Sequence, residues 1–228
     1  MTTVKLVSYT KPTEEFEQHG LMDAQDLIAF CARVSNPSAQ INSETSEKLI
    51  KYLIKHQHWS PLEMVNACLE INTTRDIAHQ IVRHRSFSFQ EFSQRYADVG
   101  ALGDMFVHRE PRLQDAKNRQ NSVDLDVNNM EDVRLAMIWS SYQNKVIQEA
   151  KEAYKWAIDN GIAKEQARVV LPEGLTKTRL YMNGTLRSWV HYIELRGGHG
   201  TQKEHMEIAW ACAKVIAEIF PLVDELKN

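Results

Sequence analysis

The sequence contains little cysteine, little net charge and no long apolar run, and each shortage excludes a class of protein. Its three cysteines, Cys31, Cys68 and Cys212, lie far apart and form no Cys-x-x-Cys pair. With no apolar leader after Met1, this odd count predicts reduced thiols in a cytoplasmic protein. No apolar run approaches the length that spans a bilayer, so we expect no membrane association. A net charge of −3 disfavours a protein that coats nucleic acid.

The composition is that of a soluble globular protein. Apolar residues make up 43% of the 228 positions and charged residues 25%. A chain of this length can bury a sizeable core, so we expect one domain over residues 1–228. A loop excursion is predicted at about 101–130, where Gly, Pro, Asn and scattered charges leave little periodicity.

Hydrophobic periodicity predicts an α+β fold in which helices pack on a small mixed or antiparallel sheet. Apolar and polar residues alternate over 64–72, and shorter strand patterns occur near 4–9 and 176–182. Helical spacing and capping residues predict helices over 23–34, from Ser43 to Ile54, over 76–82, over 131–158, from Thr185 to Arg196 and from Thr201 to about Phe220. The longest has a continuous apolar face, formed by Met137, Ile138, Tyr142, Val146, Ala150, Ala153 and Ala157.

The chemically richest stretch is 83–96, which combines arginine, histidine, glutamate, serine and aromatic residues. Because Arg83-His84-Arg85 follows an apolar helix end directly, we expect a buried element that delivers cations to a pocket. Arginine binds phosphate or carboxylate through two parallel hydrogen bonds, and serine hydroxyls can complete such a cradle. Glu91 either pairs with an arginine of this stretch or holds a polar part of a ligand. The alternative is a solvated basic loop with one ion pair.

Further polar residues stand at the ends of predicted elements, where ligand pockets are commonly built. Arg168 lies in an apolar segment that ends at Pro172, so it needs a specific partner, either a glutamate or a phosphate. Arg187 and His191 are four residues apart and share one helical face, and Arg196 follows near the end of that helix. Each has a structural explanation by itself, but their common placement favours a ligand site.

These residues carry a resemblance to a known family. Arg83-His84-Arg85, Ser93 and the run from Glu91 to Tyr96 resemble the signature of the flavin-dependent thymidylate synthases. The resemblance covers nearly the whole chain except 101–130. The other matching segments are Ala32 to Ser35, His58 with Ser60 and Glu63, Gln80, Ala167 to Pro172, and Leu186 to Arg196. Gln90 and Thr185 depart from the pattern, since asparagine is usual at both positions.

The resemblance implies a reaction, its ligands and an assembly. The reaction is the reductive methylation of deoxyuridine monophosphate (dUMP) to thymidylate. Methylenetetrahydrofolate donates the carbon unit, and FAD reduced by NADPH supplies the hydride. The protein would be a homotetramer with flavin sites between subunits.

The resemblance also implies roles for individual residues, and no metal ligand is among them. The flavin-binding residues would be Ser35, His58, Ser60, Arg83, His84, Arg85, Glu91, Thr185, Arg187 and His191. The nucleotide-binding residues would be Gln80, Arg83, Glu91, Phe92, Ser93, Gln94, Arg95, Arg168 and Arg196. Arg196 is the predicted catalytic residue, because a permanent cation beside the uracil would stabilise negative charge on its N3 edge.

Two absences agree with the resemblance. The cysteines lie in apolar or strand patterns and are predicted to be small core residues, so no cysteine nucleophile is expected. The chain also has no Gly-x-Gly-x-x-Gly sequence, so FAD would not be held by a dinucleotide-binding fold.

Three other functions fit parts of the sequence. A metal-dependent hydrolase could use His56, His58, His79, His84 and His191, but there is no His-Glu-x-x-His motif. A binder of single-stranded nucleic acid could stack bases on Phe87, Phe89, Phe92 and Tyr96, but the acidic net charge argues against it. An inactive homologue could keep the binding residues, although Arg196 together with Arg168 and Glu91 favours activity.

Overall fold

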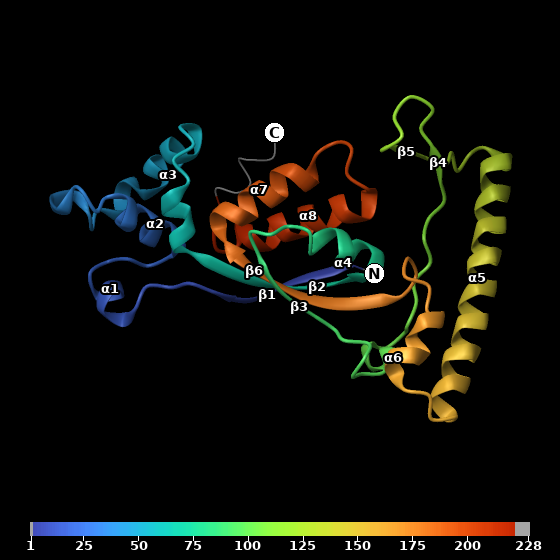
Figure 1. The fold of residues 1–228 in the computed structure, drawn as a ribbon. Coiled ribbons are helices and arrows are strands. Elements are labelled where there is room, and N and C mark those ends of the chain that lie inside the picture. The colour runs from blue at the N-terminus through green and yellow to red at the C-terminus, as the bar shows by residue number, and fades with distance from the viewer. Residues whose placement is uncertain (1, 222–228) are drawn as a thin grey trace.

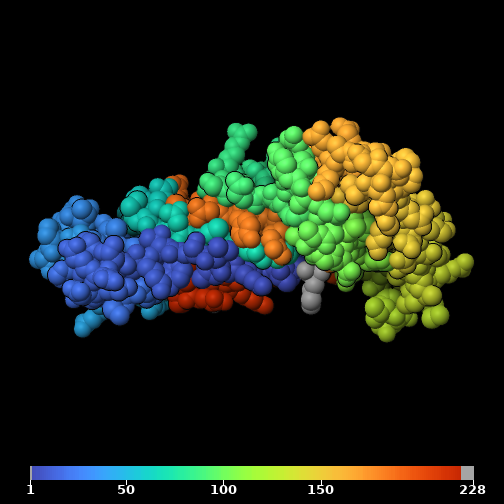
Figure 2. Space-filling model, turned by 90° about the horizontal axis from the view of Figure 1, so that it is seen from below, coloured from blue at the N-terminus to red at the C-terminus, as the bar shows by residue number. Residues whose placement is uncertain are grey.

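The computed structural model describes residues 2–221 and has the predicted α+β architecture. A four-stranded antiparallel sheet lies at its centre, with helices α7 and α8 along it and the helices α2 and α3 at one end (Figure 1). Seen from below, the molecule is elongated, with the N-terminal helices at one end and the long helix α5 at the other (Figure 2). No helix within residues 2–221 is long and apolar enough to cross a membrane.

The sheet has the order β1-β2-β6-β3, and every neighbouring pair is antiparallel. The three predicted strands are confirmed as β1 (Thr3–Tyr9), β2 (Asn66–Thr74) and β6 (Lys177–Thr185). The fourth strand, β3 (Ser88–Glu91), lies inside the arginine-rich stretch and was not predicted. Strands β2 and β6 pair over nine residues, so this pair forms the longest part of the sheet.

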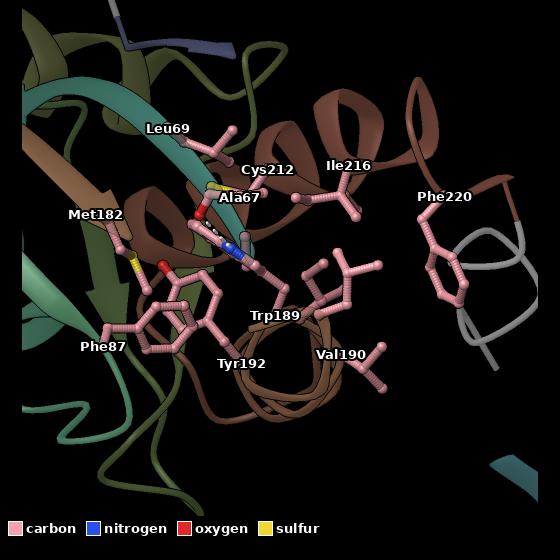
Figure 3. Close-up of a cluster of buried hydrophobic side chains, with 14 of the residues drawn as sticks. Ala67, Leu69, Phe87, Met182, Trp189, Val190, Tyr192, Cys212, Ile216 and Phe220 are labelled. Carbon is pink, nitrogen blue, oxygen red and sulfur yellow. Dashed lines mark hydrogen bonds between the residues drawn. The ribbon is translucent and has the colours of Figure 1, made fainter. Parts of the chain in front are cut away.

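The main core lies on the face of the sheet that is covered by α4 (Arg75–Ile81), α7 (Leu186–Gly197) and α8 (Lys203–Ala217). Because side chains alternate along a strand, Leu69 and Met182 face this core together. Trp189 is fully buried there, and its indole Nε1 donates a hydrogen bond to the backbone oxygen of Ala67 at 3.0 Å (Figure 3). The predicted cap of α7 is confirmed, since Thr185 accepts a hydrogen bond from the backbone of Ser188.

The N-terminal helices are α1 (Glu14–Gln18), α2 (Ala24–Ala32) and α3 (Ser46–Lys55). The predicted cap at Ser43 is wrong. Residues Ser43–Thr45 form a short 3-10 helix, η2, and α3 begins at Ser46, whose hydroxyl instead bonds Asp26. Two further 3-10 helices, η1 (Pro37–Ala39) and η3 (Ser60–Met64), begin near prolines that fix the local backbone.

The predicted excursion contains some regular structure. It follows η4 (Val99–Leu102) and includes a hairpin of β4 (Arg112–Gln114) and β5 (Ser122–Asp124). It leads into α5 (Met130–Asp159), then into α6 (Lys164–Ala167) and η5 (Arg168–Val170). These elements share a second, smaller core, formed by Val99, Phe106, Ile147, Ala150, Tyr154, Ala157, Ala167 and Leu171.

The apolar face predicted for α5 is only partly buried within the chain. Ala150 and Ala157 are buried, but Met137, Tyr142 and Val146 are 69%, 58% and 48% exposed. The face therefore lies too far around the helix to pack fully on its own chain. An apolar helix face that stays exposed on its own chain is typical of a protein-protein contact.

Gly184 has no room for a side chain, because Phe87 packs directly on it. A Cβ at this position would meet a ring carbon of Phe87 at 2.4 Å. We expect Gly184→Ala to lower the free energy of unfolding by about 1–3 kcal/mol, the usual cost of overpacking a core. Urea unfolding would measure the change, with Gly174→Ala as the control because the Cβ of that variant meets nothing closer than 3.9 Å. Equal midpoints for the two variants would contradict the prediction.

Candidate active site

The turn after α4 presents two arginines to solvent. Arg83 and Arg85 are exposed, and within residues 2–221 neither guanidinium makes a hydrogen bond or an ion pair. Ser86, next along this turn, accepts a hydrogen bond through its backbone oxygen from Ser188 at 3.2 Å. The arginine turn is therefore attached to the first turn of α7, with its cations left available.

His84, between these arginines, turns inward and contacts Arg196 near the end of α7. Nε of Arg196 donates to Nε2 of His84 at 2.9 Å. Burial, followed by the charge of Arg196, lowers the pKa of His84. Because arginine stays protonated, Nε2 of His84 must accept, so this histidine is neutral and carries its proton on Nδ1. The contact fixes the guanidinium of Arg196 and leaves its two Nη groups without a partner within residues 2–221.

Gln80 and Arg196 both belong to this part of the molecule, which also contains residues that sequence analysis missed. The amide of Gln80 contacts His205 and Gln202, and His205 contacts the hydroxyl of Tyr192. The segment from Thr201 to Glu204 was predicted only as a helix cap. It makes no side-chain capping bond, because Gln202 is directed to Gln80 and to Glu204 instead.

A second polar group lies at the start of α7, as the shared face of Arg187 and His191 predicts. Arg187 forms an ion pair with Glu63, and the ring of His191 lies 4.5 Å from that of Trp59. His58 is exposed, with its ring 6.3 Å from that of Tyr52. The structure thus brings the α7 residues and the 59–63 segment together.

No side-chain hydrogen bond within residues 2–221 joins the remaining predicted flavin-binding residues to Arg187 or His191. Ser60 is exposed at the start of η3. Ser35 is exposed on the loop between α2 and η1, and no hydrogen bond within residues 2–221 joins its side chain to the other predicted residues. Thr185 is the cap of α7, and its hydroxyl is used within the chain by Ser188.

A third polar group surrounds Glu165 of α6. Nη2 of Arg95 lies 3.3 Å from the carboxylate of Glu165, and Nε of Arg168 donates to the backbone oxygen of the same residue at 3.3 Å. The side chain of Arg168 therefore has no glutamate carboxylate as its partner, and its two Nη groups make no hydrogen bond within residues 2–221. Ser93 accepts a bond from the backbone of Arg95 at 3.4 Å.

Two other predicted nucleotide-binding residues differ in exposure. Phe92 is half-buried, whereas Gln94 is only 4% exposed and its Nε2 has no hydrogen-bond partner within residues 2–221. An unpaired buried amide is costly, so Gln94 holds a polar atom for which the described part of the chain offers no partner.

Glu91 does not pair with an arginine of its own stretch. Its Oε1 accepts from Nη1 of Arg75 at 3.1 Å and from the hydroxyl of Thr178 at 2.9 Å. Pairing within residues 83–96, one of the two alternatives for this carboxylate, is therefore wrong. Arg75 is the partner, which leaves Arg83 and Arg85 unpaired.

The third polar group lies apart from the other two (Figure 1). No hydrogen bond or ion pair within residues 2–221 joins Arg196 to the group around Glu165. In Figure 1, α6 lies beside the lower end of α5, well apart from α7. The site residues are thus divided between two regions of the protomer.

None of the cysteines resembles an activated nucleophile. Cys212 is fully buried, as predicted, while Cys31 and Cys68 are half-buried. Burial raises the pKa of all three thiols, so they stay protonated at neutral pH. The histidines considered for a metal site do not converge, since no group of three or more possible ligands is found in the described part of the chain.

Comparisons with known proteins place the chain in a family. Residues 18–222 match the family model described as thymidylate synthase complementing protein. The chain is 46% identical to a probable flavin-dependent thymidylate synthase of Paramecium bursaria Chlorella virus 1, over 97% of this chain and 96% of the viral protein. It is also 46% identical to the flavin-dependent thymidylate synthase of Synechocystis sp., over 96% of each chain. The enzyme of that name from Thermus thermophilus is 34% identical, over 86% of this chain and 68% of its own.

Solved structures share the fold. A UMP/dUMP methylase, PolB from Streptomyces cacaoi bound with 5-Br dUMP, superposes with a TM-score of 0.79 at 24% identity, over 99% of this chain and 94% of its own. The sheet and the α7–α8 layer thus belong to an α+β fold that this solved structure shares. The chain is a member of the flavin-dependent thymidylate synthase family.

Proposed function

We propose that this chain converts dUMP to thymidylate, with methylenetetrahydrofolate as the carbon donor and FAD reduced by NADPH as the hydride source. The observation that carries the proposal is the contact between Arg196 and neutral His84, which holds a cation in place with both Nη groups unpaired in the described residues. Such a preorganised cation stabilises negative charge where it develops on the pyrimidine.

The nucleotide phosphate fits the group around Glu165. A phosphate dianion is best held by arginine forks, and Arg168 retains its two Nη donors for such a partner. Arg95 pairs with Glu165 at an exposed site, where such an ion pair is weak. Arg95 can therefore turn to a phosphate at small cost, with the hydroxyl of Ser93 beside it. Glu91 and Phe92 precede these residues, and Gln94 supplies its unpaired amide.

The flavin fits the exposed arginine turn and the start of α7. A pyrophosphate is a suitable partner for Arg83 and Arg85, which have none within residues 2–221. We propose that Arg187, His191, Ser60 and His58 also bind the flavin, and that Ser35, His84, Glu91 and Thr185 contribute. When bound, reduced FAD supplies the hydride. The residues of this chain bind it and orient it.

We also propose that the enzyme is a homotetramer with flavin sites between subunits. Two observations support this assembly. The arginines that we propose for the phosphate and for the pyrimidine belong to separate groups of contacts within residues 2–221, and α5 exposes Met137, Tyr142 and Val146. A second copy would bury that face and could bring complementary halves of a site together.

We further propose one domain over residues 1–228, with the excursion at about 101–130 as part of it, and a cytoplasmic location.

The absorption spectrum of the purified protein tests this proposal, followed by addition of dUMP. We expect a yellow protein whose flavin bands shift with the nucleotide, and which forms thymidylate when methylenetetrahydrofolate and NADPH are added. A colourless protein that takes up no added FAD would contradict the flavin assignment. Sedimentation of the same sample would test the tetramer.

Ser93→Ala should weaken nucleotide binding only in part. Ser93 contributes one hydroxyl, whereas the phosphate keeps Arg95 and Arg168, so we expect Kd for dUMP to rise by about three- to tenfold. Titration of the flavin spectrum with dUMP measures this, with Ser88→Ala on β3 as the matched control. Complete inactivity of Ser93→Ala would show that the phosphate site is built differently.

A further inference from the structure

A chain of hydrogen bonds leads from the start of α8 to the core beneath Arg196. Nε2 of Gln202 lies 3.0 Å from Oε2 of Glu204, and Nε2 of Gln80 lies 2.8 Å from Oε1 of Gln202. Beyond Gln80, Nδ1 of His205 lies 3.2 Å from Oε1 of Gln80, and Nε2 of His205 lies 3.1 Å from the hydroxyl of Tyr192.

The direction of every bond in this chain follows from one end of it. An ionised carboxylate can only accept, so Gln202 must turn its NH₂ group toward Glu204 and its oxygen toward Gln80. Gln80 must then turn its own NH₂ group toward Gln202 and its oxygen toward His205. That oxygen requires a proton on Nδ1 of His205, and the free Nε2 accepts from the Tyr192 hydroxyl. One carboxylate thus sets two amide orientations and one histidine tautomer.

Glu204 is held in its ionised form by the excursion. Nη2 of Arg112 donates to both carboxylate oxygens at 2.7 and 2.8 Å, and Nη1 of Arg109 lies 3.3 Å away. Burial alone would raise the pKa of Glu204. The hydrogen bonds from Arg112, from the backbone of Glu204 and from Gln202, together with the charge of Arg109, outweigh this effect. The pKa of Glu204 is therefore lowered.

The other end of the chain is fixed by burial. His205 is fully buried, and burial, followed by the charges of Arg196 and His84, lowers its pKa to about 4. It is therefore neutral at pH 7 and has one donor and one acceptor nitrogen. Tyr192 is also buried, and its ring contacts that of His84 edge-on at a centroid distance of 4.9 Å. The chain thus ends against the histidine that orients Arg196.

We propose that Glu204, Gln202 and His205 are positioning residues that fix the orientation of the Gln80 amide for the nucleotide. This inference rests on the proposed function and on the nucleotide-binding role that the family resemblance implies for Gln80. The hydrogen-bond chain uses one N–H and one lone pair of the Gln80 amide. One N–H and one lone pair then remain for a ligand, in a defined arrangement. Without these hydrogen bonds, the Gln80 amide could rotate by 180° and exchange the positions of its donor and acceptor.

The tautomer of His205 tests the orientation without any ligand. In protein labelled with 15N-histidine at pH 7, we expect a neutral His205 with the proton on Nδ1. In Gln80→Ala that preference should be lost, because Nε2 could then donate to the Tyr192 oxygen instead. A proton on Nε2 of His205 in the unsubstituted protein would mean the reverse amide orientation and would overturn the proposal.

A double-mutant cycle tests the consequence for binding, since it isolates the coupling between two residues. Gln202 is exposed, so Gln202→Ala should leave the unfolding midpoint and the flavin content unchanged. It should raise Kd for dUMP by about five- to tenfold, the effect of one lost hydrogen bond. Adding Gln202→Ala to Gln80→Ala should produce no further rise.

Gln120→Ala is the matched control, because its side chain is exposed and makes no hydrogen bond within residues 2–221. An unchanged Kd in Gln202→Ala, or an equal rise in both backgrounds, would overturn the positioning role while leaving the proposed function intact. An unsubstituted protein that binds neither FAD nor dUMP would overturn the proposed function and, with it, the role of Gln80 in nucleotide binding.

Discussion

Arg196→Ala should lower turnover by on the order of 10²–10³-fold or more while FAD stays bound. The expected size is that of removing one preorganised group that stabilises transition-state charge. Arg196 is half-buried, and its only hydrogen bond within residues 2–221 is donated by Nε to His84. The two Nη groups are the ones that would face the pyrimidine. The residues at the start of α7 that we propose for flavin binding make no hydrogen bond to Arg196 within residues 2–221, so flavin binding should be unaffected.

Single-turnover formation of thymidylate would measure this loss, with flavin content read from the absorption spectrum. Arg134→Ala is a suitable control, because this arginine is exposed on α5 and makes no hydrogen bond or ion pair within residues 2–221. Arg196→Lys should recover little of the turnover. Lysine has a single nitrogen, whereas the guanidinium can donate to His84 through Nε and to the substrate through its Nη groups. Full activity of Arg196→Ala, or loss of its flavin, would remove this residue from the assigned role.

Arg109→Ala should lower the free energy of unfolding by about 2–3 kcal/mol, somewhat less than the loss typical of breaking a fully buried ion pair at one partner. Nη2 of Arg109 bonds the Thr74 hydroxyl at 2.5 Å and both carboxylate oxygens of Asp76 at 2.8 and 3.0 Å. Its Nε bonds the backbone of Gly174 at 3.1 Å, and Nη1 lies 3.3 Å from Glu204. The side chain is only 16% exposed, so solvent would replace these contacts poorly.

The same variant should loosen the excursion from the body of the protein. Backbone groups of Arg109 bond the side chain of Gln143 on α5, at 2.7 and 2.9 Å, so this residue joins α5, α4 and α8. Urea unfolding and limited proteolysis between 103 and 129 would measure both effects. Arg119→Ala, at an exposed arginine of the same excursion, provides the control. Unchanged stability and unchanged cleavage in Arg109→Ala would show that the contacts contribute little.

Local sequence patterns predicted the elements whose formation depends on neighbouring residues. The alternation over 64–72 and the cap at Thr185 were confirmed because strand faces and helix caps are set within a few positions. The strand β3 has only four residues and exists because β6 offers it a partner, so its own sequence carried little signal. The apolar face of α5 was recognised, but its partner is not within the described part of the chain.

The site was predictable only as a set of residues. The signature indicated Arg83, His84 and Arg196, but the contact between His84 and Arg196 spans 112 positions and depends on how the turn after α4 packs against α7. Arg109 and His205 were missed for a related reason. Arg109 lies in a stretch without periodicity, and His205 lies on a helix whose pattern indicated only burial. A histidine that directly follows Glu204 near a helix start was the one available signal.

The position of β6 between two partners restricts where this chain can change in length. A one-residue insertion within β6 would turn its following side chains to the opposite face and would disturb its pairing with both β2 and β3. The same shift would turn Thr185 to the opposite face of the strand and would change the direction in which α7 begins. The tip of the β4–β5 hairpin, at 115–121, is largely exposed and pairs with no other strand, so insertions and deletions among related sequences should gather there rather than in the sheet.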